Sequence, residues 1–151
     1  MNSTPKGFTL VETLLALVIL GTLAILGFPR MSVGMSSASV RGARTTLINL
    51  VAKARIAATQ TNRITLLKIQ GNNAFVLARP RLLPGVGNAD TLGSVERLGA
   101  SYGVTLTATI DSVRFDPRGL GTGFGTGTSF VISRNATADT VTIDGLGRVT
   151  K

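Results

Sequence analysis

The carboxylate of Glu12 has the most unusual chemical setting in this sequence. It is the one charge in an apolar run that extends from Phe8 to Phe28. A charge at the centre of a bilayer costs about 2.5–3.5 kcal/mol even on lenient scales, so such a residue indicates a function. A carboxylate held away from water must also be paired. Glu12 is therefore a candidate contact residue; the alternative is that it lies near enough to one end of the run to reach the membrane interface.

The other acidic residues offer little for catalysis. The chain has neither His nor Cys, which removes the commonest general base, the commonest metal ligand and all thiolate chemistry. A hydrolytic site would then need paired carboxylates, whereas aspartates that flank predicted strands are typical of surface turns. These aspartates are Asp111, Asp116, Asp139 and Asp144. We expect no enzyme activity, no catalytic residue, no metal site and no cofactor.

A glycine-rich stretch, DPRGLGTGFGTGT at 116–128, has the composition of a phosphate-binding loop. Its spacing does not fit, because it contains neither G-x-G-x-x-G nor G-K-S/T, and a predicted strand follows it where a helix is needed. The stretch is therefore predicted to be a turn and loop between strands.

The charge balance is basic. The chain has sixteen Lys and Arg residues and seven Asp and Glu residues, which gives a formal charge of +9. This excess favours a polyanionic partner, either nucleic acid or anionic lipid. Because the arginines are scattered along the chain, solubility is the alternative explanation. On a helix, Arg41, Arg44 and Arg55 would project within about 60° of one another, as a basic stripe or as a solvated flank.

Two helical segments are predicted to position these residues. The run 8–28 is long enough to cross a bilayer core, which takes about 20 residues. Residues 29–62 are predicted to continue as an amphipathic helix, with Pro29 kinking or locally opening it. The apolar face of this second segment consists of Val40, Leu47, Val51, Ala54 and Ala58.

The pattern changes to strands after Asn62. The runs ITLLKI and AFVLAR are joined by QGNN, which predicts a hairpin, and residues 81–94 are predicted to be a loop. Further strands are predicted at 104–110, 112–115, 129–133, 140–143 and 148–151. The fold class is therefore α+β, with a long N-terminal helix packed on one or more antiparallel β-sheets.

The segment KGFTLVE resembles the type III signal of type IV pilins and pseudopilins. In that family a short basic leader ends in Gly, a peptidase cuts after it, the new N-terminal residue is N-methylated, and Glu is fifth in the mature chain. The matching residues here are Lys6, Gly7, Phe8 and Glu12, and Pro29 corresponds to the family's Pro near the end of the apolar stretch. The resemblance implies that Glu12 pairs with the Phe8 amino group of the same or a neighbouring subunit.

The same resemblance implies four segments and a location. These are a prepilin leader (1–7), a transmembrane and assembly helix (8–28), an amphipathic continuation (29–62) and a β-rich globular pseudopilin domain (63–151). The protein would span the plasma (inner) membrane once, with its C-terminal domain outside the cytoplasm. Its implied partners are other pilins or pseudopilins, the prepilin peptidase/methyltransferase and the inner-membrane assembly platform.

Two C-terminal motifs are similar to those of the GspH/FimT group of minor pseudopilins, FDPRG at 115–119 and GRV at 147–149. Some members of the FimT branch are thought to bind DNA through a Gly-Arg-x-Arg tail. This chain has Thr150 where the second Arg would be, and Lys151 follows it. The candidate DNA-binding residues are Arg148, Lys151, Arg118 and Arg134, the last two as neighbours of the tail if the strands converge.

The resemblance therefore predicts a minor pilin or pseudopilin subunit of a type II secretion or type IV pilus fibre. One alternative is a DNA-binding minor pilin for natural transformation. Another is a membrane-anchored β-rich protein unrelated to pili. The N-terminal motif is shared by secretion and pilus systems and does not separate them.

Overall fold

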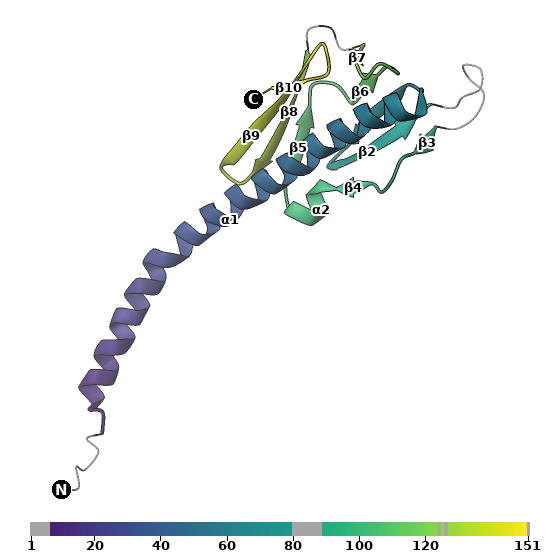
Figure 1. The fold of residues 1–151 in the computed structure, drawn as a ribbon. Helices are drawn as coiled ribbons and strands as arrows, with labels where there is room; N and C mark the ends of the chain where they lie inside the picture. The colour runs from purple at the N-terminus through teal and green to yellow at the C-terminus, as the bar shows by residue number, and fades with distance from the viewer. Residues whose placement is uncertain (1–6, 80–88, 124, 126, 151) are drawn as a thin grey trace, which may run out of the picture. The chain divides into compact units, whose positions relative to one another are not determined.

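The computed structural model describes residues 7–79, 89–123, 125 and 127–150 (Figure 1). The predicted loop at 81–94 lies largely outside these residues. The chain divides into two units, residues 1–35 and residues 36–151. A single helix, α1 (Leu10–Thr61), contributes to both units. Each unit is described by itself.

The first unit consists mainly of the beginning of α1. Its large apolar side chains are exposed along the whole segment, from Leu10 at 75% to Met35 at 61%. An 18-residue window of α1 reaches a mean hydropathy of 2.3, with none of it buried, so this helix is long and apolar enough to cross a membrane. α1 continues without interruption past Pro29, so the predicted local opening of the helix is not observed.

The second unit contains the rest of α1, which is amphipathic as predicted. Val40, Leu47, Val51, Ala54 and Ala58 are all buried, and Ala43 and Leu50 complete the same face. The exposed polar residues off this face include Asn49, Lys53, Gln60 and Asn62. The helical periodicity of apolar residues therefore identified the face that packs on the sheets.

One sheet is built around the predicted hairpin. β1 (Thr65–Gln70) and β2 (Asn73–Ala78) pair antiparallel through a two-residue turn that begins with Gly71, whose φ is +58°. The strand order is β3-β2-β1-β6-β7, and β4 also pairs with β2. The other members are β3 (Asp90–Thr91), β4 (Glu96–Arg97), β6 (Ser112–Phe115) and β7 (Gly121–Thr122).

The other sheet has the order β10-β9-β8-β5 and is antiparallel throughout. Its longest strands, β8 (Gly127–Arg134) and β9 (Thr137–Asp144), form a hairpin. β5 (Thr105–Ala108) and β10 (Val149–Thr150) lie at the two edges. A short helix, α2 (Leu98–Tyr102), precedes β5.

α1 and both sheets share one hydrophobic core. Apolar side chains from α1, from β1, β2 and β6 of the first sheet, and from β5, β8 and β9 of the second belong to a single buried cluster. The hydroxyl of buried Thr65 also donates a hydrogen bond to the α1 carbonyl of Ala54 at 2.7 Å. Figure 1 shows this part of α1 lying across the strands. The predicted α+β architecture, with the helix packed on antiparallel sheets, is confirmed.

Several short elements differ from the prediction. β3 lies inside the predicted loop 81–94 and extends the edge of β2, where Thr91 pairs with Leu77. α2 was also missed, because five residues are too few for a helical pattern. Its C-cap is Gly103, whose N–H donates to the carbonyl of Gly99 and whose φ of +63° is left-handed.

Candidate functional site

The start of α1 is organised by Thr9. Residues Gly7 to Thr9 have no regular structure, and the helix begins at Leu10. The N–H of Glu12 donates to the Thr9 hydroxyl at 3.2 Å and to its carbonyl at 3.1 Å. The N–H of Thr13 donates to the same carbonyl at 3.2 Å. Thr9 therefore has the hydrogen bonds of a helix N-cap, and the predicted cleavage point between Gly7 and Phe8 lies outside the helix.

Glu12 lies in the first turn of α1 and is exposed. An acidic side chain in this turn interacts favourably with the helix dipole. The sequence Thr9-Leu10-Val11-Glu12 also has the spacing of a capping box. This signal identifies Thr9 as a functional candidate that the sequence analysis missed.

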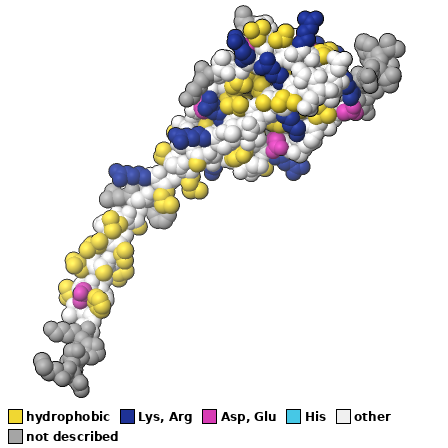
Figure 2. Space-filling model, viewed as in Figure 1, with side chains coloured by type: hydrophobic (Ala, Val, Ile, Leu, Met, Phe, Trp, Pro, Cys, Tyr) yellow, Lys and Arg dark blue, Asp and Glu magenta, His cyan; other side chains and the backbone are white. Residues whose placement is uncertain are grey.

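The apolar part of α1 around Glu12 is exposed along its length. Figure 2 shows hydrophobic side chains along this end of α1, whereas Lys and Arg are spread over the visible face of the globular part. Phe8 is 80% exposed, and Leu10 and Val11 are about as exposed. So large a contiguous apolar surface is typical of a helix that lies in a membrane or packs against other apolar helices.

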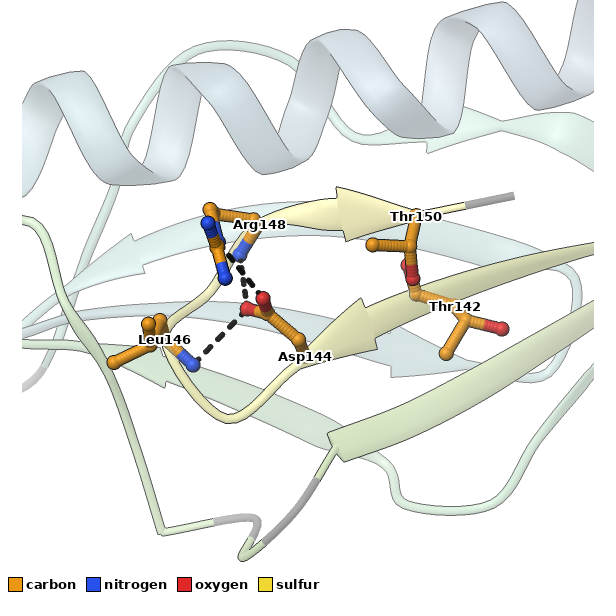
Figure 3. A network of polar contacts seen from close by, with 5 residues as sticks. All are labelled: Thr142, Asp144, Leu146, Arg148 and Thr150. Atoms are coloured by element: carbon orange, nitrogen blue, oxygen red, sulfur yellow. Dashed lines mark hydrogen bonds and ion pairs between the residues drawn. The ribbon is translucent and has the colours of Figure 1, made fainter.

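The predicted tail residue Arg148 belongs to the turn between β9 and β10 (Figure 3). Oδ1 of Asp144 accepts hydrogen bonds from the N–H groups of Leu146 at 3.0 Å and Arg148 at 2.7 Å. Oδ2 of Asp144 pairs with Nε of Arg148 at 2.8 Å. The Arg148 N–H, together with its guanidinium and the Leu146 N–H, holds the pKa of the Asp144 carboxyl below its ordinary value of 3.8.

The turn between β6 and β7 repeats this arrangement. Oδ1 of Asp116 accepts hydrogen bonds from the N–H groups of Arg118 and Leu120, both at 2.9 Å. In each turn the fourth residue is a glycine that donates to the carbonyl of the aspartate at 2.8 Å; these are Gly119 and Gly147. The motifs FDPRG and GRV therefore belong to two turns with the same pattern, Asp-x-x-Gly-x.

The two turns lie against each other. A Cβ added at Gly147 would be 2.7 Å from Cε1 of Phe115 and 3.0 Å from the backbone nitrogen of Gly121. Only a residue without a side chain fits this space, and its φ of +79° also favours glycine. The packing brings Arg118 and Arg148, both exposed, onto neighbouring turns.

Arg134 lies elsewhere. It stands at the opposite end of the β8–β9 hairpin from Asp144, because Arg134 pairs with Thr137 and Asp144 pairs with Gly127. Its Nη1 donates to the hydroxyl of Ser39 and, at 2.8 Å, to the carbonyl of Tyr102. The structure therefore does not bring Arg134 to the predicted tail site, and Lys151 lies outside the described residues.

One further carboxylate is paired across two elements. Asp139 forms an ion pair with Arg44 of α1 at 3.4 Å, and both side chains are largely shielded from water. Among the described residues no three or more Asp, Glu, His or Cys side chains are grouped to hold a metal ion. Arg44, predicted as part of a stripe, contacts the β8–β9 hairpin.

A match to a protein-family model lies in the N-terminal segment. The prokaryotic N-terminal methylation motif matches residues 2–28. This range contains Gly7, Phe8 and Glu12, the residues at the non-helical start of α1 and in its first turn. A comparison with curated protein sequences gives no significant match.

Solved structures with the same fold include the type IV minor pilin FimU of Pseudomonas aeruginosa. One crystal form aligns with a TM-score of 0.60 at 16% identity, covering 76% of this chain and 88% of that chain. A second form aligns with a TM-score of 0.55 at 17% identity, covering 73% and 90%. This chain therefore combines a prepilin-type methylation motif with a type IV pilin fold, as the sequence resemblance predicted. The narrower GspH/FimT assignment is not tested by these matches.

Proposed function

We propose that this protein is a minor pilin or pseudopilin, processed by a prepilin peptidase and assembled through its N-terminal helix into a type II secretion or type IV pilus fibre. One observation carries the proposal. The methylation motif coincides with the start of a long helix whose apolar window is entirely exposed. A helix held first in the inner membrane and then among the helices of a fibre would have its apolar surface covered at both stages.

The start of α1 suits this processing. Hydrolysis of the Gly7–Phe8 amide by water would leave a carboxylate on Gly7 and an amino group on Phe8, and one proton of that amino group would then be replaced by a methyl group from the methyltransferase's methyl donor. A positive charge next to a helix N-terminus opposes the helix dipole. Glu12, in the first turn, would offset it within the subunit or bind the amino group of a neighbour.

The decisive experiment is the intact mass of the protein extracted from membranes. We expect loss of everything up to Gly7 and the gain of one methyl group. Gly7→Val should block the cut, because side-chain bulk would then lie at the scissile bond. Glu12→Ala should still be cut, yet be lost from sheared fibres. A mature chain that starts beyond Phe28 would exclude the proposal.

DNA binding is a second candidate function. It is favoured by one observation, the packing of the turns that carry exposed Arg118 and Arg148. Two guanidinium groups on neighbouring turns could contact successive phosphates. The ion pair of Arg148 with Asp144 reduces its contribution, because the carboxylate would remain near the phosphate.

A further inference from the structure

Thr9 lies between the start of α1 and the peptide bond that the proposed peptidase would cut. Its hydroxyl and its carbonyl both accept the N–H of Glu12, and its carbonyl also accepts the N–H of Thr13. The helix starts one residue later, at Leu10. The Gly7–Phe8 peptide is thereby the second peptide bond before Thr9, outside the helix.

The conformation of that bond matters for hydrolysis. A peptide bond inside a helix has its carbonyl engaged with the N–H four residues on, and its backbone is coiled. A peptidase must reach the carbonyl with water and bind the flanking backbone. A free, non-helical segment at Gly7 and Phe8 meets this need, and a helix extended by one turn would not.

We propose that Thr9 is a positioning residue for processing, whose side chain fixes the start of α1 and keeps the Gly7–Phe8 bond outside the helix. The inference rests on the proposed function. Alanine has no side-chain oxygen that could cap the helix, and it is the best helix former. Thr9→Ala should therefore favour extension of α1 towards Gly7 for both reasons.

The test follows processing of the full precursor in membranes that contain a prepilin peptidase, by intact mass over time. Thr9→Ala should be cut several-fold more slowly, roughly fivefold for the loss of a typical cap. Thr9→Ser and Thr9→Asp should restore the rate, because both side chains can cap. The matched control is Thr13→Ala, which removes a hydroxyl that donates to the Leu10 carbonyl at 2.8 Å and caps nothing; its rate should equal that of the wild type.

A second measurement distinguishes an effect of Thr9 on the helix from direct recognition of its side chain by the peptidase. Carbon chemical shifts of the uncut precursor in micelles should show Gly7 and Phe8 non-helical in the wild type and helical in Thr9→Ala. The inference would be overturned if Thr9→Ala were cut at the wild-type rate. It would also be overturned if Thr9→Ala were cut slowly without becoming helical at Gly7 and Phe8, or if Thr9→Ser did not restore the rate. If the wild type itself is not cut after Gly7, the proposed function fails instead.

Discussion

At the scale of single residues, Asp144 is the best-connected side chain of the C-terminal turn. Three donors from Leu146 and Arg148 stabilise its ionised form and lower its pKa from the ordinary value of 3.8. A carboxyl whose pKa is lower in the folded than in the unfolded protein stabilises the fold above the unfolded value. This contribution is lost as the pH falls through the folded value.

The first prediction concerns this pH dependence. Asp144→Asn keeps an oxygen that can accept the two N–H groups but loses the negative charge. The wild type should therefore be more stable than the variant at pH 5 to 7, and the difference should shrink as the pH falls below about 3.8. Urea unfolding of both proteins at a series of pH values measures the difference, and a constant difference would contradict the assignment.

The second prediction concerns Gly147. Gly147→Ala should destabilise the fold by about 2 kcal/mol or more, because a Cβ there meets Phe115 and requires a strained φ of +79°. Gly123→Ala is the matched control, since its φ of +84° is similar and a Cβ would have no described neighbour within 4 Å. The difference between the two unfolding free energies gives the cost of crowding alone. Equal effects would mean that the turns do not pack as described.

At the scale of elements, polar contacts attach α1 to the β8–β9 hairpin. Arg134 reaches Ser39 and the Tyr102 carbonyl, and its neighbour Asn135 donates to the Ser36 hydroxyl at 2.9 Å. The hydroxyl groups of Tyr102 and Thr46 also lie 2.9 Å apart. Arg134 is thus a structural residue that links α1, α2 and β8.

The third prediction compares two arginines that the sequence proposed for the same role. Arg134→Ala should destabilise the fold by about 1–3 kcal/mol, because two partly buried acceptors lose their donor. Arg118→Ala, at an exposed position, should stay within about 0.5 kcal/mol of the wild type. Thermal unfolding of residues 36–151, which contain the whole buried core, measures both. A neutral Arg134→Ala would show that these contacts do not hold the helix.

The elements predicted from sequence are those with strong periodicity. The buried face of α1 repeats at helical spacing from Val40 to Ala58, and β6 was predicted with its observed bounds. The missed elements, β3, β4, β7 and α2, are two to five residues long. They form because a neighbouring strand or a buried side chain such as Leu98 is present, and that information is not local in the sequence.

The candidate sites were predictable to different degrees. The sequence alone was enough to propose the cleavage, methylation and assembly residues, because Gly7, Phe8 and Glu12 belong to one contiguous motif. The two turns could have been found from the spacing Asp-x-x-Gly, shared by residues 116–119 and 144–147. The partners of Arg134 could not be predicted from sequence, because Ser39 is 95 residues away along the chain.

At the scale of the whole molecule, the formal charge of +9 favours association with polyanions. The fourth prediction concerns the binding of residues 36–151 to duplex DNA. If the two turns contact DNA, their arginines contribute to the salt dependence of the affinity. Each neutralised phosphate contributes about −0.9 to the slope of log affinity against log salt. Arg118→Ala combined with Arg148→Ala should flatten the slope by up to about 2.

The control for this titration is Arg41→Ala combined with Lys68→Ala, which removes the same charge from exposed positions on α1 and β1. It should leave most of the slope unchanged. Equal flattening by both pairs would mean diffuse attraction with no site at the turns. Absence of binding at low salt would remove DNA as a partner and leave the fibre subunit as the function.

The close approach of Gly147 to Phe115 also has a consequence for the timing of synthesis. β10 and the turn before it emerge after every other described strand, and Gly147 then covers the ring of Phe115. Until then the ring lacks its outer neighbour, and β9 has an open edge where Thr142 will later pair with Thr150. A nascent chain that is still being translated therefore carries an unfinished globular part, while its apolar N-terminal segment has already been made. Synthesis of the apolar segment thus comes first, and closure of the globular part comes last.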